Sequence, residues 1–449
     1  MQTKDTFQSK LFSLVIPIAF QQLMLAIISA TDAIMLGLVD QVSLSAVSLA
    51  GQVQFVFSMI IAGSADGSGI LIAQYWGKGD KKSIRAIAPL ALRINLIAGV
   101  FWTVVTIAIP QYVMMIFTLD VELIQAGAAY LQAVSLSYLL FAISQVYMCL
   151  LKNIGKAKAV SNISSTAVVL NIILNAILIF GLFGFPKLGI VGAAYATVIS
   201  RFVELALAVL VCNKEDVTLE WKRLFASEKV LMQDFLHNFK IFVGASVVWG
   251  VGSTMYSVIL GHMGNDAVAA NSIASIVRTL VFCFCRGLGV GTMVMVGNVL
   301  GSGELELAKE YGKKLSKLSV LFGIASGLVM GTFIPLIVRF APLEPTATKL
   351  LQGMLLFGIP YMVAKSYNVT VLNGILAAGG EMKFDMYGNI GAMWCFTIPL
   401  GFMAAFWWKL PVLAVFCIIN LDEIVKIPAV YWYYKKYKWV KDLTRENSL

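Results

Sequence analysis

The chain has 449 residues, of which 59% are hydrophobic and only 13% are charged. Soluble domains carry about 25% charged residues, so this chain cannot cover a water-facing surface of its own size. The composition predicts an integral membrane protein and excludes the secreted, fibrous and nucleic-acid-binding classes. The net charge of +10 must therefore be interpreted by its position along the chain.

Apolar stretches separated by charged and Gly/Pro-rich clusters predict an all-α membrane protein with twelve transmembrane helices. A spanning helix needs about 20 apolar residues, and twelve of them with their connectors leave no room for a large soluble domain. The expected helices cover residues 11–38, 44–76, 87–110, 122–151, 159–182, 188–212, 238–262, 266–300, 312–339, 347–377, 384–408 and 410–433.

The two halves of the chain repeat short patterns at a constant distance. Residues 77–80 (Gly-Lys-Gly-Asp) end the second helix, and residues 301–304 (Gly-Ser-Gly-Glu) end the eighth, 224 positions later. The pairs Gly-Lys at 155–156 and Gly-Glu at 380–381 follow the fourth and tenth helices, 225 positions apart. Six helices per half place both halves in the same orientation. Such parallel repeats are related by a pseudo-two-fold axis along the membrane normal, with the substrate bound between them.

The repeat divides the chain into an N-terminal six-helix lobe (1–212), a charged inter-lobe linker (213–237) and a C-terminal six-helix lobe with a basic tail (238–449). Lys and Arg residues are distributed unevenly between the connectors, with 24 on the side of the N-terminus and 4 on the other. Cytoplasmic loops carry the excess of Lys and Arg. Both termini and the linker are therefore expected in the cytoplasm, with the chain crossing the bacterial inner membrane many times.

Short motifs occur in a fixed order along the chain, namely TDAIM at 31–35, GKGD at 77–80, Asn171-x3-Asn175, and GAA-x-AT at 192–197. In this order and spacing they resemble the bacterial type of the multidrug and toxic compound extrusion (MATE) family. The resemblance covers nearly the whole chain. It implies a cation-coupled exporter, not an enzyme, whose two lobes rock to give alternating access.

Asp32 is the clearest ionisable residue inside a predicted span, where a charge costs about 2.5–3.5 kcal/mol on insertion scales. Asp32 and Asn175 each lie about seven residues, ~10 Å, from the outer ends of their helices, and Thr197 lies ~13 Å deep. Asn171 is one turn from Asn175 on the same helix face. Their oxygen atoms suit Na⁺, whereas Asp32 alone suits a proton. Interhelical hydrogen bonding is the alternative for the Asn and Thr side chains.

MATE members use the matching residues for ion coupling. The resemblance therefore implies a coupling site, for Na⁺ or H⁺, that consists of Asp32, Asn171, Asn175 and Thr197. Asp66, which lies between Gly63 and Gly67 in the second helix, is a candidate second titrating site. The two glycines also indicate close helix packing.

The second lobe lacks this set of residues. Some MATE members carry carboxylates in the seventh and tenth helices, and this chain has none there. Residue pairs three or four apart, Arg201 with Glu204 and Asp422 with Lys426, are interpreted as structural pairs. Basic and aromatic side chains are the candidates for a substrate cavity, with structural pairing as an equal alternative for the basic ones: Trp249, Tyr256, Arg278, Arg286, Tyr361 and Lys365.

The leading hypothesis is an antiporter that exports small organic compounds or drugs across the plasma membrane against an inward flow of Na⁺ or H⁺. No cofactor is expected beyond this transported ion. The expected partners are membrane lipids and a small organic substrate, without nucleic acid, and the chain is expected to act as a monomer. The alternative is a related flippase for a lipid-linked or anionic substrate, which the basic residues of the second lobe favour.

The uneven distribution of Lys and Arg generates a topology prediction. Cysteine substituted at Lys222 or Lys229 should react with an impermeant thiol reagent only after the cells are opened, because the linker is expected in the cytoplasm. Lys187, in a connector assigned to the opposite side, is the matched control and should react in intact cells. Labelling of the linker positions in intact cells would overturn the topology.

Overall fold

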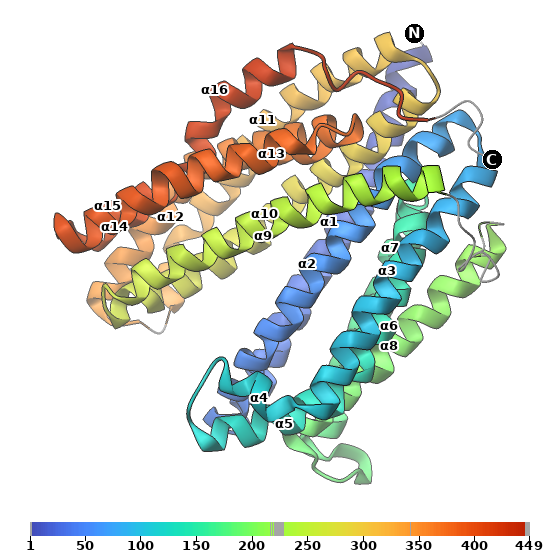
Figure 1. Ribbon diagram of the computed structural model, residues 1–449. Helices are drawn as coiled ribbons and strands as arrows, with labels where there is room; N and C mark the ends of the chain where they lie inside the picture. The colour runs from blue at the N-terminus through green and yellow to red at the C-terminus, as the bar shows by residue number, and fades with distance from the viewer. Residues whose placement is uncertain (1, 216, 218, 220–228, 342, 445–449) are drawn as a thin grey trace. The chain divides into compact units, whose positions relative to one another are not determined.

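The computed structural model describes residues 2–215, 217, 219, 229–341 and 343–444 (Figure 1). Positions 216, 218 and 220–228 of the predicted linker, Lys222 among them, lie outside the described residues. Every regular element in the described ranges is helical, which confirms the all-α fold class. A backbone in lipid must satisfy its own polar groups, and a helix does this within one segment. Eleven of the described helices are long and apolar enough to span a membrane.

Residues 2–214 form eight α-helices and one short 3₁₀ helix. The predicted span at 122–151 is divided at Ser135 into two helices, and a short helix precedes it. The elements are α1 (Gln2–Gly37), α2 (Gln41–Lys78), α3 (Lys81–Ala108), α4 (Pro110–Met115), α5 (Val121–Val134), α6 (Leu136–Asn153), α7 (Ala157–Phe180), η1 (Leu182–Gly184) and α8 (Gly189–Lys214).

The second half contains longer helices and several π-helical segments. Its elements are α9 (Lys229–Gly261), α10 (Asn265–Gly301), α11 (Leu305–Phe340), α12 (Pro345–Asn368), η3 (Val369–Leu376), α13 (Met382–Asn389), η4 (Ile390–Thr397), α14 (Ile398–Phe402), η5 (Met403–Trp407), α15 (Val412–Ile419) and α16 (Asp422–Lys435). The segments η3, η4 and η5 are π-helical.

The predicted last helix, 410–433, is broken between α15 and α16. Asn420 ends α15, and its side-chain amide donates a hydrogen bond of 2.8 Å to the carbonyl oxygen of Phe416. A side chain that bonds to the nearby backbone competes with the regular helix ladder. The break leaves segments of 8 and 14 residues, each shorter than a membrane-crossing helix.

Contacts within the chain form two compact units. Unit 1 contains the residues up to Gln22, Gly77–Gly79 and Lys240–Thr444, and unit 2 contains Leu23–Trp76 and Asp80–Phe239. Helix α1 is therefore shared, because its first part is grouped with the second half of the chain. This division groups residues by their contacts and does not test the predicted lobes, which end at residue 212 and begin at residue 238. Those lobe boundaries stay a prediction.

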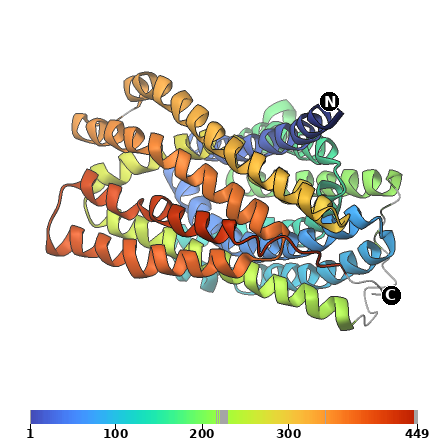
Figure 2. The same ribbon diagram turned by 90° about the horizontal axis from the view of Figure 1, so that it is seen from above.

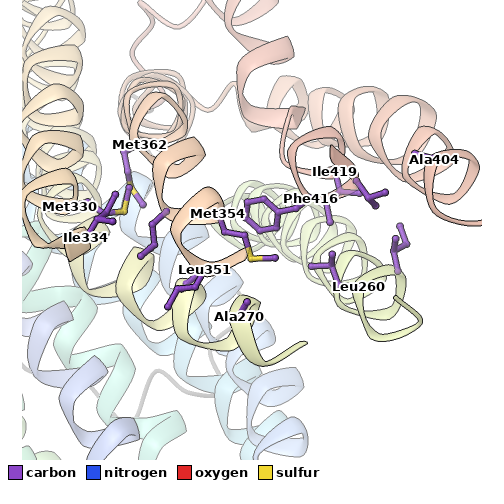
Figure 3. Packing of buried hydrophobic residues seen from close by; sticks show 14 residues of the cluster. Leu260, Ala270, Met330, Ile334, Leu351, Met354, Met362, Ala404, Phe416 and Ile419 are labelled. Carbon is purple, nitrogen blue, oxygen red and sulfur yellow. The ribbon is translucent and has the colours of Figure 1, made fainter. Parts of the chain in front are cut away.

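Within unit 2, α3, α6, α7 and α8 lie side by side (Figure 1). Within unit 1, α10, α11 and α12 pack against one another, and α13 to η5 run antiparallel to α15 and α16 (Figure 2). Phe416 and Ile419 of α15 meet Leu351 and Met354 of α12 in a fully buried cluster (Figure 3). This cluster holds α15 in place beside α10 and α12 although the helix is short.

Glycines with a positive φ angle recur at the repeated positions. Gly79 has φ of 79° and Gly303 has φ of 80°, while Gly155 has 85° and Gly380 has 76°. Left-handed residues of this kind end helices, and glycine adopts them without a steric penalty. The repeat seen in the sequence is therefore also a repeat of backbone conformation.

The same turns carry an ion pair in each unit, with the charges exchanged. In unit 2, Lys156 Nζ lies 2.8 Å from Glu215 Oε2. In unit 1, Lys441 Nζ lies 2.6 Å from Glu381 Oε1, and the hydroxyl of Tyr433 donates to Glu381 Oε2 at 2.6 Å. Each pair ties the turn after one helix to the chain that follows the last helix of its half.

This exchange of charges predicts a result for charge-swap variants. Glu381→Lys should lower the free energy of unfolding by about 1 kcal/mol, the scale of a partly exposed pair plus the new repulsion. The double variant Glu381→Lys with Lys441→Glu should recover most of the loss. Thermal unfolding of the purified protein measures both changes. Equal losses in the single and double variants would contradict the pairing.

The same pair predicts a pH dependence. Burial raises the pKa of Glu381, but hydrogen bonds from Lys441 and Tyr433 outweigh it and hold the pKa below its ordinary value of 4.5. The stabilisation should therefore be complete above pH 4.5 and be lost as the pH falls through the lowered value. The variant Glu381→Gln should lack this acid-dependent part of the unfolding profile.

Candidate functional site

The four predicted coupling residues form one chain of hydrogen bonds within unit 2. Asn175 Nδ2 donates to Asp32 Oδ1 at 2.6 Å and to Asn171 Oδ1 at 3.0 Å. Asn171 Nδ2 lies 3.5 Å from Thr197 Oγ1, which donates to the carbonyl of Ala193 at 3.0 Å. The structure brings the four residues together from α1, α7 and α8. Their role in coupling stays a prediction.

Small residues allow this contact between α7 and α8. A Cβ atom on Gly192 would lie 2.5 Å from the carbonyl oxygen of Leu178, which is closer than any side chain tolerates. The glycine therefore permits the two backbones to approach. This approach places Asn171 and Thr197 within reach of each other.

An apolar layer lies one helical turn beyond the polar chain, on the same three helices. Leu36, Ile179 and Ala193 pack together and are buried, and each is four positions from Asp32, Asn175 or Thr197. Tyr130 of α5 packs against this layer. The layer excludes water from one end of the polar chain.

Burial differs among the members of the polar chain. Asn171 and Asn175 are fully buried, whereas Asp32 and Thr197 are half-buried. Among the described residues, no donor reaches the buried Asn175 Oδ1. An acceptor without a donor next to a carboxylate is suited either to Na⁺ or to the O–H donor of a protonated Asp32.

Asp66 lies on α2 in a closely packed stretch. A Cβ atom on Gly67 would lie 3.1 Å from the backbone nitrogen of Phe239, and one on Gly69 would lie 2.9 Å from Asn153 Nδ2. Gly67 thus has the packing role that was predicted for it together with Gly63, and Gly69 has it as well. Asp66 itself is half-buried, and its assignment as a titrating site stays a prediction.

The predicted cavity residues fall into two groups. Arg278 and Lys365 both lie over the ring of Tyr361, at 5.8 and 5.4 Å from its centre. Tyr256 lies in the same unit, where its hydroxyl and Thr397 Oγ1 are 2.7 Å apart. The second group consists of Trp249 and Arg286, which make no contact with these residues in the described contacts. Both side chains are exposed, Trp249 by 39%.

A buried charged network in unit 1 extends well beyond the predicted pair of Asp422 and Lys426. Lys426 Nζ lies 3.8 Å from Asp422 Oδ2 but 3.2 Å from Glu423 Oε2. It also donates to Asn389 Oδ1 at 3.0 Å, and Asn389 Nδ2 donates to Asp385 Oδ1 at 3.3 Å. All five side chains are buried.

Sequence reasoning identified two members of this network and missed three. Asp385 and Asn389 are four positions apart, a helix-face spacing that the sequence shows, but nothing in the sequence indicates that they meet Lys426. Glu423 lies three positions before Lys426 in α16, a helix-face spacing that the sequence also shows. In the predicted pair of α8, by contrast, Arg201 Nη1 lies 2.7 Å from Glu204 Oε2, as its spacing indicates.

Comparisons with known proteins agree over nearly the whole chain. The MatE family model matches residues 17–177 and 243–403. The uncharacterized transporter YisQ of Bacillus subtilis is 23% identical over 96% of this chain and 95% of its own length. The probable multidrug resistance protein NorM of Thermotoga maritima is 24% identical over 98% of this chain and 95% of its own.

Solved structures show the same fold. The bent form of the Vibrio cholerae MATE transporter VcmN matches with a TM-score of 0.86 at 19% identity, covering 98% of both chains. A MOP superfamily transporter from Pyrococcus furiosus matches with a TM-score of 0.87 at 18% identity, covering 96% of both. The two stretches matched by the family model also have equal length, one in each half of the chain. The protein belongs to the MatE family, and it is a multi-pass membrane transporter and not an enzyme.

Proposed function

We propose that the protein is an antiporter that uses an inward flow of Na⁺ or H⁺ to export small organic compounds across the bacterial plasma membrane. The observation that carries this proposal is the polar chain from Asp32 to Thr197, sealed at one end by the layer of Leu36, Ile179 and Ala193. The relative NorM of Thermotoga maritima is described as a probable multidrug resistance protein, which supports export of organic compounds.

Asp32 is the residue through which the ion acts in this proposal. Only a group that is stabilised differently in two conformations can link ion flow to a conformational change. A buried carboxylate is costly when charged, and a proton or Na⁺ removes this cost. With the ion bound, the sealed arrangement is favoured. With the site empty, the charge requires water and favours an open arrangement.

The remaining side chains act as ligands and holders in this scheme. Asn175 donates to Asp32 and Asn171 at once, so it fixes the carboxylate relative to α7. Its own Oδ1 supplies a neutral oxygen ligand. Hard cations, of which Na⁺ is one, are bound by oxygen atoms of this kind. Thr197 lies at the far end of the chain and holds Asn171.

The first test concerns the charge of Asp32. Asp32→Asn keeps the shape and the acceptor for Asn175 but removes titration and most affinity for Na⁺. Export of ethidium and of carboxyfluorescein is measured in vesicles with an imposed Na⁺ or pH gradient. The variant should lose gradient-driven export of each dye that the unmutated protein exports. Glu122→Gln, which removes an exposed carboxylate at the start of α5, is the control and should export normally. Export by Asp32→Asn at the unmutated rate would refute the coupling assignment.

The second test uses the order of the hydrogen bonds. Asn175→Ala should reduce gradient-driven export less than Asp32→Asn does, because the charge remains. Thr197→Val should reduce it least, since three hydrogen bonds separate Thr197 from Asp32 and its contact with Asn171 is 3.5 Å long. Initial export rates under the same gradient measure the series. A larger loss in Thr197→Val than in Asn175→Ala would place the ion elsewhere.

A further inference from the structure

Two basic side chains in unit 1 lie on the same aromatic ring. Arg278 comes from α10 and Lys365 from α12, and the two helices are in contact. The guanidinium carbon of Arg278 is 5.8 Å from the centre of the Tyr361 ring, and Lys365 Nζ is 5.4 Å from it. Two like charges thus share one ring. The carboxylates of Asp422 and Glu423 are near enough to attract Lys365, and Asp422 also attracts Arg278, but neither carboxylate forms an ion pair with them.

Neither basic side chain has an ion-pair partner in the part of the chain that the structure describes. Arg278 Nη1 donates to the neutral Asn420 Oδ1 at 3.1 Å. The remaining contacts of the pair are with rings, Arg278 at 5.2 Å from the centre of Phe416 and Lys365 at 4.7 Å from that of Phe282. Cation–π contacts of this kind orient a charge without neutralising it.

The neighbouring carboxylates make their ion pairs with Lys426, although Asp422 Oδ1 has no hydrogen-bond partner among the described residues. Glu423 accepts hydrogen bonds from Lys426 at 3.2 Å and from Asn368 Nδ2 at 2.8 Å, and Asp422 lies 3.8 Å from Lys426. Nor do three acidic, His or Cys side chains among the described residues converge as metal ligands. The acidic groups and Lys426 therefore form an internal network behind the basic pair.

Exposure separates the two sets of charges. Asp385, Asp422, Glu423 and Lys426 are buried, whereas Arg278 and Lys365 are half-buried. Ionisable side chains in membrane helices face the bundle interior or a water-filled cavity, not lipid. By this rule, the exposed parts of Arg278 and Lys365 are expected to face the bundle interior or water and not lipid.

We propose that Arg278 and Lys365, with the rings of Tyr361 and Phe282, form a binding site for an organic anion, a carboxylate, sulfonate or phosphate attached to an apolar or aromatic body. The anionic group contacts the guanidinium and ammonium groups, and the apolar body packs on the rings. The proposal rests on the proposed export function because it names the chemical class of the substrate.

Binding to the purified full-length protein tests this site without any ion gradient. Equilibrium dialysis in detergent would compare carboxyfluorescein, an aromatic anion, with ethidium, an aromatic cation. Lys365→Met and Arg278→Gln should each raise the Kd for carboxyfluorescein by about tenfold, the effect of one charged hydrogen bond. The Kd for ethidium should not rise. Carboxyfluorescein binding by both variants with the unmutated Kd would refute the site.

Controls separate the loss of charge from the loss of structure. Lys349→Met removes an exposed charge from the same helix α12 and should bind carboxyfluorescein normally, while Lys365→Arg should retain binding. Added salt should weaken carboxyfluorescein binding to the unmutated protein, a test that needs no variant. Equal losses in Lys365→Arg and Lys365→Met, or no effect of salt, would contradict the proposal.

The source of the anion and the coupling site are tested separately. Competition by short-chain phosphatidylglycerol that depends on Lys365 would identify a lipid headgroup as the anion, and its absence would identify a soluble one. The binding assay imposes no ion gradient, so its result does not depend on the coupling role of Asp32. If the unmutated protein showed no gradient-driven export, the antiport function would be refuted. The dependence of carboxyfluorescein binding on Arg278 and Lys365 would still stand.

Discussion

The cost of placing polar and charged groups in a membrane determines how this protein is built. Each such group in the spans has to meet another polar group, an ion or water. Asp32 meets Asn175, and Lys426 meets Glu423 and Asn389. The positions of these groups therefore decide which helices must lie together. The apolar remainder of the helices packs with less specificity.

The two units meet this requirement in different ways. At the predicted coupling site, unit 2 uses neutral amides and one hydroxyl around a single carboxylate, joined through regular helices. Unit 1 uses paired charges and an irregular backbone, because η3 begins directly after Asn368, η4 begins directly after Asn389, and α16 begins at Asp422. Irregular helices are frequent at functional sites, and helix breaks in transporters place polar groups at membrane depth.

In the proposed mechanism, this difference assigns ion binding and substrate recognition to different units. A single carboxylate whose hydrogen-bond partners are neutral can gain and lose a cation, because no ion pair holds it. A buried cation held by carboxylates is fixed, and it leaves Arg278 and Lys365 free for an anion. The ion would then act in unit 2, and the substrate would be recognised in unit 1.

The sequence alone determined the class of the protein, most of its helices and the polar residues that are proposed to couple transport to an ion. Apolar runs of membrane length and their polar breaks are local properties, so composition and spacing predict them. Asp32, Asn175 and Thr197 were found because three polar residues lay at one predicted depth. The repeat was visible because glycines that end helices occur at fixed positions. Arg201 and Glu204 were paired because residues three apart on a helix are neighbours.

Only the tertiary structure decided which residues of different helices meet. Asp385 and Asn389 are 37 or more positions from Lys426, so no local pattern connects them. The break at Asn420 and the π-helical segments arise where side chains and packing disturb a ladder that the apolar sequence would continue. The shared ring of Arg278 and Lys365 likewise depends on the contact between α10 and α12. A helix face can be predicted from one segment, but its partner is set by the packing of all the helices together.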